Sequence, residues 1–338
     1  MKAAFYSKYG SPDVISIKEV EKPRPGAGEV LVRVRAASVN AYDWRLICAK
    51  PFFTRLLGGV FKPKDNIPGA DVAGVVEAAG EGAALFQPGD EVFGCLEGCG
   101  AGGLATGGFA EYVCAKESVL APKLPALSFA EAAALPMASV TALQAVRDDA
   151  KVQPGQSVLI NGASGGVGTF AVQIAKALGA QVTAVCGAGA VDVVRSLGAD
   201  CVIDYSKEDV ASSGKQFDAV IDVAATLSVK DYRRLLKPNG TCVAVGFSSI
   251  RHLLSHSLAG TRDGKRITLC KANNKVADPL LGINELIQAG QLRAVIDSHY
   301  PLEEAAEAIR RAAAGHPKGK VVIEMQELTS DLVAIEYL

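Results

Sequence analysis

The sequence predicts an α/β protein of two domains, in which a mainly antiparallel β domain is followed by a doubly wound parallel sheet. The chain has 338 residues, more than one hydrophobic core usually serves. Up to residue 120, β-branched and polar residues alternate, whereas from residue 155 short apolar strands alternate with helical periods. Hydrophobic residues make up 49% and charged residues 21% of the chain, as in a folded globular protein.

The first 120 residues contain alternating segments such as EVLVRVRAASVN, separated by Pro/Gly turns such as KPRPGAGE and FQPGDE. This pattern predicts an antiparallel β domain. The pattern then changes, because Ser128 is followed by Glu131 at the spacing of a capping box, which predicts the start of a helix. We therefore expect the domain boundary close to these residues.

The second half of the chain alternates strands and helices. Apolar segments predict strands at 156–162, 180–186, 201–205, 217–224, 240–246 and 266–272, and helical periods predict helices at 167–179, 191–198 and 229–237. This alternation implies right-handed crossovers and a parallel sheet. The tail adds a strand, a helix and a strand that we expect to return to the first domain. The predicted domains are therefore residues 1–122 with 292–338, and residues 123–291.

The turn GASGGVG, residues 162–168, joins the first parallel strand to its helix. Its small residues let the backbone approach a phosphate, and the open helix N-terminus suits a diphosphate. The alternative is a tight turn that binds nothing, but the strand–turn–helix context favours a dinucleotide. The expected contacts are Ala163, Ser164, Gly165, Gly166, Val167 and Gly168. A GK[ST] sequence is absent from the turn, so nucleotide hydrolysis is disfavoured.

The end of the second parallel strand indicates which dinucleotide binds. NAD sites usually carry Asp or Glu at this position, where this chain has Cys186. The absence of a carboxylate removes the repulsion of a 2′-phosphate, although neither Gly187 nor Gly189 supplies a positive charge. We therefore expect NADPH, with NADH possible but weaker.

Charge and hydropathy exclude other classes of function. The formal net charge of −1 provides no general attraction for nucleic acid. The N-terminus lacks the features of a signal or transit peptide, and no window approaches 18 uninterrupted apolar residues. We expect a soluble protein of the cytoplasm, or of a plastid without a recognisable transit peptide.

Several motifs together resemble the medium-chain dehydrogenase/reductase superfamily, in its zinc-independent quinone oxidoreductase branch. They are NIPGADVAG, FQPGDEVFG, GGFAEYV, AAALPMASVTALQAV, NGASGGVGTFAVQIAKALGA, SLGADCVIDY and GKVVIE. The chain looks closest to plant and chloroplast-envelope homologues. The resemblance implies a GroES-like catalytic domain, a Rossmann domain, and hydride transfer from NADPH to a small lipophilic quinone or to the C=C bond of an α,β-unsaturated carbonyl.

The same resemblance assigns roles to single residues. Thr141 matches a position beside the nicotinamide, and Tyr205 matches one lining the adenosine phosphate. Gly246 and Phe247 are further expected cofactor contacts. NADPH-binding relatives carry Arg or Lys where this chain has Gly189, which is a departure from the pattern. A monomer or a homodimer is expected, with dimerisation through a sheet edge near residues 266–272.

Zinc-binding relatives place metal ligands where this chain has Asn40, Ala70 and Asp71, so we expect no metal. His252 and His256 lie one helical turn apart, but without a third ligand they are expected to be loop or surface residues. Tyr112 and Lys116 have the YxxxK spacing of short-chain dehydrogenases, yet they lie in a strand-like segment, which disfavours a catalytic role.

Asn40, Tyr42 and Asp43 occupy the segment where a zinc site would be, and are the candidate catalytic residues. Asn40 or Tyr42 could donate a hydrogen bond to the substrate carbonyl oxygen. The alternative is that Asn40 and Asp43 only cap a turn. Trp44 is either a wall of the substrate pocket or part of the core.

The segment from residue 48 to 66 combines apolar residues, including Phe52 and Phe53, with basic ones. It could line the mouth of a pocket, touch a membrane surface as a peripheral contact, or fold against its own domain.

A competing function for the whole chain is an NADPH-binding redox sensor or crystallin-like protein without turnover. The C-terminal residues 329–338 extend past the usual end of the family.

Overall fold

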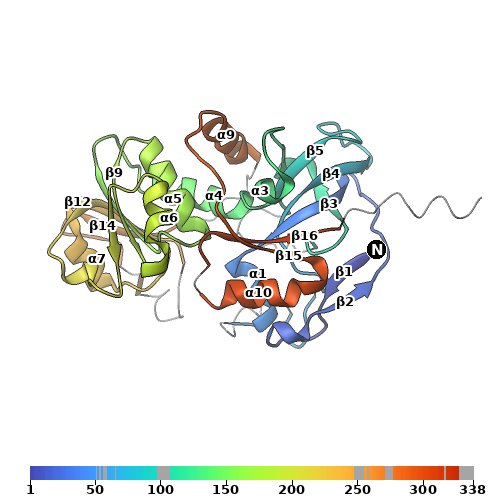
Figure 1. The fold of residues 1–338 in the computed structure, drawn as a ribbon, viewed down its shortest axis with the longest axis horizontal. Coiled ribbons are helices and arrows are strands. Elements are labelled where there is room, and N and C mark those ends of the chain that lie inside the picture. Colours follow the sequence, from blue (N-terminus) through green and yellow to red (C-terminus); the bar gives the residue numbers. More distant parts are fainter. Residues whose placement is uncertain are drawn as a thin grey trace, which may run out of the picture.

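The computed structural model describes residues 1–50, 52, 55, 59–64, 66–96, 107–246, 255–256, 259–270, 277–315 and 317–326. Within these residues the chain forms two large sheets at opposite ends of the molecule, with helices α3, α4 and α9 between them (Figure 1). The predicted α/β class, with a GroES-like and a Rossmann domain, is confirmed. The exact domain boundaries stay a prediction.

The Rossmann sheet has the strand order β10-β9-β8-β11-β12-β14-β13. Its strands are β8 (Ser157–Asn161), β9 (Gln181–Cys186), β10 (Cys201–Asp204), β11 (Phe217–Asp222), β12 (Leu236–Ala244), β13 (Thr261–Arg262) and β14 (Lys265–Leu269). All neighbours are parallel except β13, which runs antiparallel to β14. Its helices are α5 (Gly166–Ala177), α6 (Val191–Ser196) and α7 (Val229–Leu235). All six predicted strands and all three helices are present.

The strand order reverses at β8, because β9 and β10 continue on one side of it and β11 and β12 on the other. Ligands of open parallel sheets bind at such a switch point, beyond the carboxyl ends of the strands. The glycine turn follows β8 at this place. The strand near residues 266–272, proposed as a dimer edge, is second from the edge, because β13 pairs with its first residues.

The GroES-like sheet has the order β15-β16-β3-β4-β5-β7, and β6 also pairs with β3. Its strands are β3 (Glu29–Val39), β4 (Asp71–Ala79), β5 (Glu91–Cys95), β6 (Tyr112–Lys116), β7 (Leu120–Pro122), β15 (Ile296–Pro301) and β16 (Lys320–Glu324). The tail thus returns to this sheet, where β16 runs antiparallel to β3. Tyr112 and Lys116 are in strand β6, as expected from the sequence.

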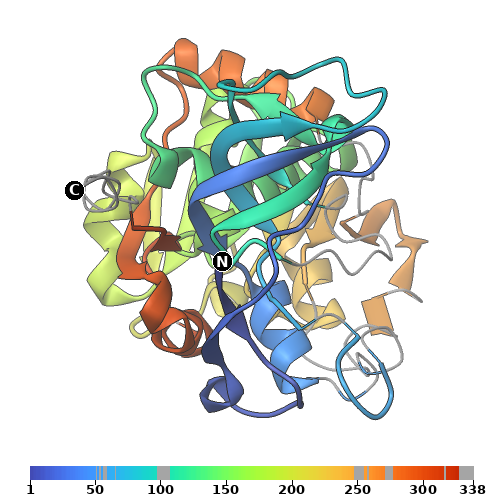
Figure 2. The same cartoon turned by 90° about the vertical axis from the view of Figure 1, so that its right-hand side faces the viewer.

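Smaller elements surround this sheet. They are the pair β1 (Lys2–Phe5) and β2 (Ser16–Glu19), and helices α1 (Ala41–Cys48) and α10 (Ala305–Ala313). Figure 2 shows the blue N-terminal strands beside the red α10 region, where Lys2 Nζ donates to Glu303 Oε1 at 3.0 Å. Short 3₁₀ turns lie at Pro12–Val14, Glu117–Val119, Ala188–Ala190, Val210–Ser212 and Leu302–Glu304.

The remaining helices are α3 (Phe129–Ala133), α4 (Pro136–Leu143), which continues into a π-helical turn (Gln144–Asp149), and α9 (Ala277–Gln288). The predicted capping box is present: Ser128 Oγ accepts from the N–H of Glu131 at 3.2 Å, and the Glu131 carboxylate accepts from the N–H of Ser128 at 2.9 Å. A new helix begins at Pro136, where proline fits the first turn. None of the described helices is long and apolar enough to cross a bilayer.

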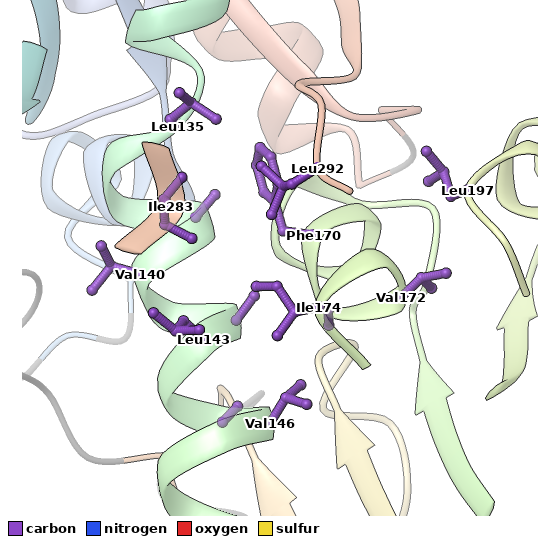
Figure 3. Packing of buried hydrophobic residues seen from close by; sticks show 14 of the residues in the cluster. Leu135, Val140, Leu143, Val146, Phe170, Val172, Ile174, Leu197, Ile283 and Leu292 are labelled. Carbon is purple, nitrogen blue, oxygen red and sulfur yellow. The ribbon is translucent and has the colours of Figure 1, made fainter. Parts of the chain in front are cut away.

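A shared core joins the two halves of the molecule. Figure 3 shows Leu143 and Val146 of the α4 segment facing Phe170 and Ile174 of α5, with Ile283 of α9 beside them. Each of these side chains is almost fully buried, and such burial contributes about 1.5–3 kcal/mol per side chain. Because α5 starts at the glycine turn, this packing fixes the turn relative to the GroES-like sheet.

One histidine departs from expectation. His256 is 1% exposed and meets the Tyr232 ring edge-on at 5.1 Å between centroids, so it is a core residue rather than a surface one. Its imidazole supplies a flat surface that fills the space against Tyr232, a role that residue spacing does not reveal. His252 lies outside the described residues.

Candidate active site

The glycine turn leaves the start of α5 open. An ideal Cβ on Gly168 would lie 2.1 Å from the carbonyl oxygen of Gly162, so only glycine fits there. Gly165 caps the helix without any side-chain hydrogen bond, and the first intrahelical bond runs from the Thr169 N–H to the Gly165 carbonyl at 2.9 Å. The preceding N–H groups, from Gly166 to Gly168, therefore have no intrahelical acceptor.

These features fit a dinucleotide diphosphate. A Cβ on Gly165 would have nothing nearer than 3.7 Å, so the space above the turn is open, and the helix dipole favours an anion there. Beneath the turn, the N–H of Ala163 donates to the Val185 carbonyl at 2.9 Å, which anchors it to β9. The carbonyl of Ser164 accepts from the N–H of Gly319 at 2.9 Å and thereby holds the C-terminal segment.

Next to β8 in the sheet, β9 finishes at the buried Cys186, whose thiol has its pKa raised by burial. The N–H of Tyr205 donates to the Cys186 carbonyl at 3.1 Å. The Tyr205 side chain is 56% exposed, and its hydroxyl would lie 3.0 Å from a Cβ on Gly187. The missing side chain of Gly187 thus makes room for this phenol, and the assignment of Tyr205 to the cofactor stays a prediction.

Thr141 lies on α4 and donates from Oγ1 to the Met137 carbonyl at 2.6 Å, so the hydroxyl hydrogen is engaged within the helix. Gly246 follows β12, and a Cβ on it would meet no described atom within 4 Å. Phe247 lies outside the described residues. The assignment of Thr141 and Gly246 to the cofactor stays a prediction.

A buried polar cluster adjoins the glycine turn. Lys320 Nζ donates to Asn40 Oδ1 at 2.5 Å and lies 3.6 Å from Asp71 Oδ2, while Asn40 Nδ2 donates to the same Asp71 oxygen at 2.9 Å. All three residues are less than 10% exposed. They come from the end of β3, the start of β4 and the start of β16, and the antiparallel register of these strands brings them together.

Charge balance explains how this cluster can be buried. Burial raises the pKa of Asp71 and lowers the pKa of Lys320, and each residue opposes the shift of the other. Asp71 also accepts from Ser38 Oγ and from the N–H of Met137, both at 3.1 Å. Because a lysine only donates, the amide oxygen of Asn40 must face it, and the amide hydrogens face Asp71 and the Ser38 carbonyl.

Asp43 adds a titratable group beside the cluster. It is 1% exposed, and its Oδ2 accepts from the N–H of Asn40 at 2.7 Å, so the predicted turn-capping role is present. Its other oxygen is buried without a hydrogen bond from the described residues. Burial raises the pKa of Asp43 to about 7, and the nearby Asp71 adds to this shift. The carboxyl group therefore exchanges its proton near neutral pH.

These residues do not fit a zinc ion. A zinc site needs three or more side-chain ligands, and the described residues contain no such group of His, Cys, Asp and Glu. Asn40 and Asp71 are instead engaged with the Lys320 ammonium, and the Ala70 side chain has no ligand atom. A fixed cation at this place repels a metal ion.

The other candidate residues are spread around α1. Tyr42 is half-buried in its first turn and packs against the shared core. Trp44 is half-buried, packs against the core of the GroES-like sheet, and has the Arg45 guanidinium 5.5 Å from its ring centroid, which favours its core role. Phe52 is 72% exposed, and Phe53 lies outside the described residues.

Lys320 was not predicted from the sequence as a site residue. The available signal was a lysine within the otherwise apolar strand segment GKVVIE, where a charged side chain needs a buried partner.

Comparisons with known proteins agree with this architecture. Residues 26–126 match the family described as alcohol dehydrogenase GroES-like domain, and residues 197–323 match the family described as zinc-binding dehydrogenase. A GroES-like domain followed by a Rossmann sheet defines the medium-chain dehydrogenase/reductases, a class of oxidoreductases that use a nicotinamide cofactor.

Within this class the relatives are specific. A chloroplastic quinone-oxidoreductase of Triphysaria versicolor is 37% identical, covering 96% of this chain and 98% of its own. A 2-methylene-furan-3-one reductase of Solanum lycopersicum is 33% identical, over 96% and 79%. The solved quinone oxidoreductase from Coxiella burnetii has a TM-score of 0.84 at 29% identity, over 96% and 99%. The chain belongs to the quinone oxidoreductase branch of the medium-chain dehydrogenase/reductases.

Proposed function

We propose that this protein is an NADPH-dependent oxidoreductase that reduces quinones, or the C=C bond of α,β-unsaturated carbonyls, without zinc. One observation carries the proposal: the open glycine turn and the buried Lys320 cluster meet at the same junction. A Cβ on Gly166 would lie 2.9 Å from Lys320 Cδ. A dinucleotide held by the turn therefore lies beside a site that is polar, dry and without metal ligands.

When bound, the nicotinamide supplies the hydride for the reduction. The tasks left to the chain are to hold the substrate carbonyl, to donate a hydrogen bond to its oxygen, and to exclude water. Both amide hydrogens of Asn40 are engaged by Asp71 and Ser38, so we assign Asn40 a positioning role. Tyr42 is then the candidate donor to the carbonyl oxygen, and the neighbouring Asp43 caps the start of α1.

The names of two relatives support the two substrate classes. One is a quinone-oxidoreductase and the other reduces 2-methylene-furan-3-one, an unsaturated ketone. A panel of quinones and enones, followed by the loss of NADPH absorbance, tests the proposal and separates the classes. Turnover of neither class, together with tight NADPH binding, would instead favour the redox sensor or crystallin-like protein.

Cofactor binding itself is tested by titrating the purified protein with NADPH and NADH. We expect a lower dissociation constant for NADPH. Failure to bind either nucleotide would overturn the whole proposal.

The oligomeric state, a monomer or a homodimer, stays a prediction. The location, in the cytoplasm or in a plastid, also stays a prediction, and the chloroplastic relative supports the plastid. The exposed Phe52 and the 96% exposed Phe61 suit either a lipophilic substrate or a membrane surface.

A further inference from the structure

A lysine from the C-terminal segment lies over the loop that follows β9. An ideal Cβ on Gly189 would lie 3.5 Å from Lys318 Nζ and 3.6 Å from Lys318 Cε. Gly189 lies in the 3₁₀ turn (Ala188–Ala190) that follows β9 of the Rossmann sheet, whereas Lys318 precedes β16 of the GroES-like sheet. The end of the Lys318 side chain therefore lies about one van der Waals contact away from the loop at Gly189.

The backbone around Lys318 is held from both sides. The next N–H, of Gly319, donates to the Ser164 carbonyl in the glycine turn at 2.9 Å. The N–H of Lys318 itself donates to Asp297 Oδ1 at 2.7 Å. Asp297 is fixed in turn by two hydrogen bonds from Arg311, at 3.0 and 2.7 Å. The backbone of Lys318 is thus held in a defined position beside the glycine turn.

The side chain of Lys318 is available for a ligand. It is exposed, and its ammonium makes no hydrogen bond or ion pair within the described part of the chain. The nearest acidic residue along this loop, Asp192, has Arg195 as its partner at 3.8 Å. On the neighbouring strand, Asp204 accepts hydrogen bonds from the hydroxyl and N–H of Ser206. A positive charge therefore stands over the loop beside acids that already have partners.

This loop is where a dinucleotide-binding sheet meets the adenosine ribose, because it follows the last residue of the second strand. That residue is Cys186, which carries no charge, since burial raises the pKa of its thiol. The phenol of Tyr205 faces the same loop across Gly187. One hydroxyl and one ammonium thus converge on the place where NADPH differs from NADH by a phosphate.

We propose that Lys318 binds the 2′-phosphate of NADPH and so selects NADPH over NADH. The inference rests on the proposed function, because it assumes that a nicotinamide dinucleotide is bound at the glycine turn. A charge-assisted hydrogen bond to phosphate corresponds to roughly a 10-fold or greater difference in affinity. The cation comes from the other domain, which is why the loop after β9 can lack one.

The test measures dissociation constants by calorimetry for NADPH, NADH, 2′,5′-ADP and AMP with the full-length protein. Lys318→Met keeps the apolar stem and removes the charge. We expect it to weaken NADPH and 2′,5′-ADP by about 10-fold or more, and to leave NADH and AMP within about 2-fold. In the Lys318→Met background, Gly189→Arg should restore the preference, because its side chain starts beside the vacated space.

Lys207→Met is the matched control, since it removes a lysine from the turn after β10, where Lys207 lies 3.7 Å from Asp204. Loss of NADPH preference in this variant instead of Lys318→Met would overturn the inference. Equal weakening of NADPH and NADH by Lys318→Met would also overturn it, because that result indicates a structural role. A wild-type protein without NADPH preference would overturn both the inference and the proposed cofactor, whereas an unaffected Lys318→Met would overturn the inference alone.

Discussion

The glycine turn and the buried polar cluster touch each other, yet they are built in opposite ways. The turn is one contiguous stretch, residues 162–168, and its function depends on backbone shape alone. The cluster is assembled from Asn40, Asp71 and Lys320, which come from three strands. A binding site for a diphosphate can therefore be encoded locally, whereas the electrostatics of the reaction site depend on strand register.

The two regions should also fail in different ways. The turn is limited by space, since Gly168 and Gly162 leave no room for a side chain. The cluster is limited by charge, since Lys320 and Asp71 are each nearly inaccessible to water. Added side-chain volume should therefore be most damaging at the glycine turn, and removal of a charge should be most damaging in the Lys320 cluster.

Lys320→Met should have the largest effect. It leaves the Asp71 carboxylate buried without its cation, and breaking a buried pair in this way costs about 3–5 kcal/mol of unfolding free energy. Urea unfolding measures the loss. Lys318→Met, two residues earlier and exposed, is the control and should keep wild-type stability. The double variant with Asp71→Asn should recover part of the loss, and a fully stable Lys320→Met would contradict the ion pair.

Gly168→Ala should come next. Its Cβ would lie 2.1 Å from the Gly162 carbonyl oxygen, so the turn must move, at a cost of about 3 kcal/mol, and cofactor affinity should fall with it. Gly282→Ala, in the helix α9, is the matched control, because no described atom lies within 4 Å of its Cβ. Thermal melting and NADPH titration test both variants. Wild-type binding by Gly168→Ala would show that the turn does not hold the diphosphate.

The Rossmann half was predictable because its signals are local. Strands β8, β9 and β11 are short and mainly apolar, and β8 leads directly into the glycine turn. The capping box at Ser128 and Glu131 also gave the start of α3. In these places periodicity and side-chain type determine the local structure without distant partners.

The reaction site was only partly predictable. Asn40 and Asp43 were recognised as candidates, but the sequence left open whether they cap a turn or contact a substrate. The structure shows that Asp43 does cap the start of α1 and is also buried enough for a raised pKa. Lys320 and Lys318 were missed, because the residues beside their ammonium groups lie more than 120 residues away along the chain: Asn40 and Asp71 for Lys320, and Gly189 for Lys318.

The pH dependence of stability tests the charge of Asp43, which lies beside the Lys320 cluster. Its pKa in the folded protein, about 7, lies above the ordinary value of 3.8, so the folded state binds this proton more tightly than the unfolded chain. Its contribution to stability is therefore greatest at low pH and falls as pH rises through 7. Between about pH 5 and about pH 8, wild type should lose roughly 2 kcal/mol relative to Asp43→Asn. Parallel stability curves for the two proteins would exclude the raised pKa.

Tyr42→Phe should have the smallest effect of these substitutions. It should change the rate of turnover and leave the free energy of unfolding and the affinity for NADPH unchanged. If the phenol donates to the substrate carbonyl oxygen, its loss should lower kcat/KM for enones about 10-fold, with NADPH affinity unchanged. Tyr205→Phe is the matched control in the loop after β10, beside Gly187, and should weaken NADPH binding while leaving kcat unchanged. Full enone turnover by Tyr42→Phe would remove this residue from the mechanism. The remaining activity would then have to come from positioning beside the Lys320 cluster, because Asn40 has no amide hydrogen left to donate.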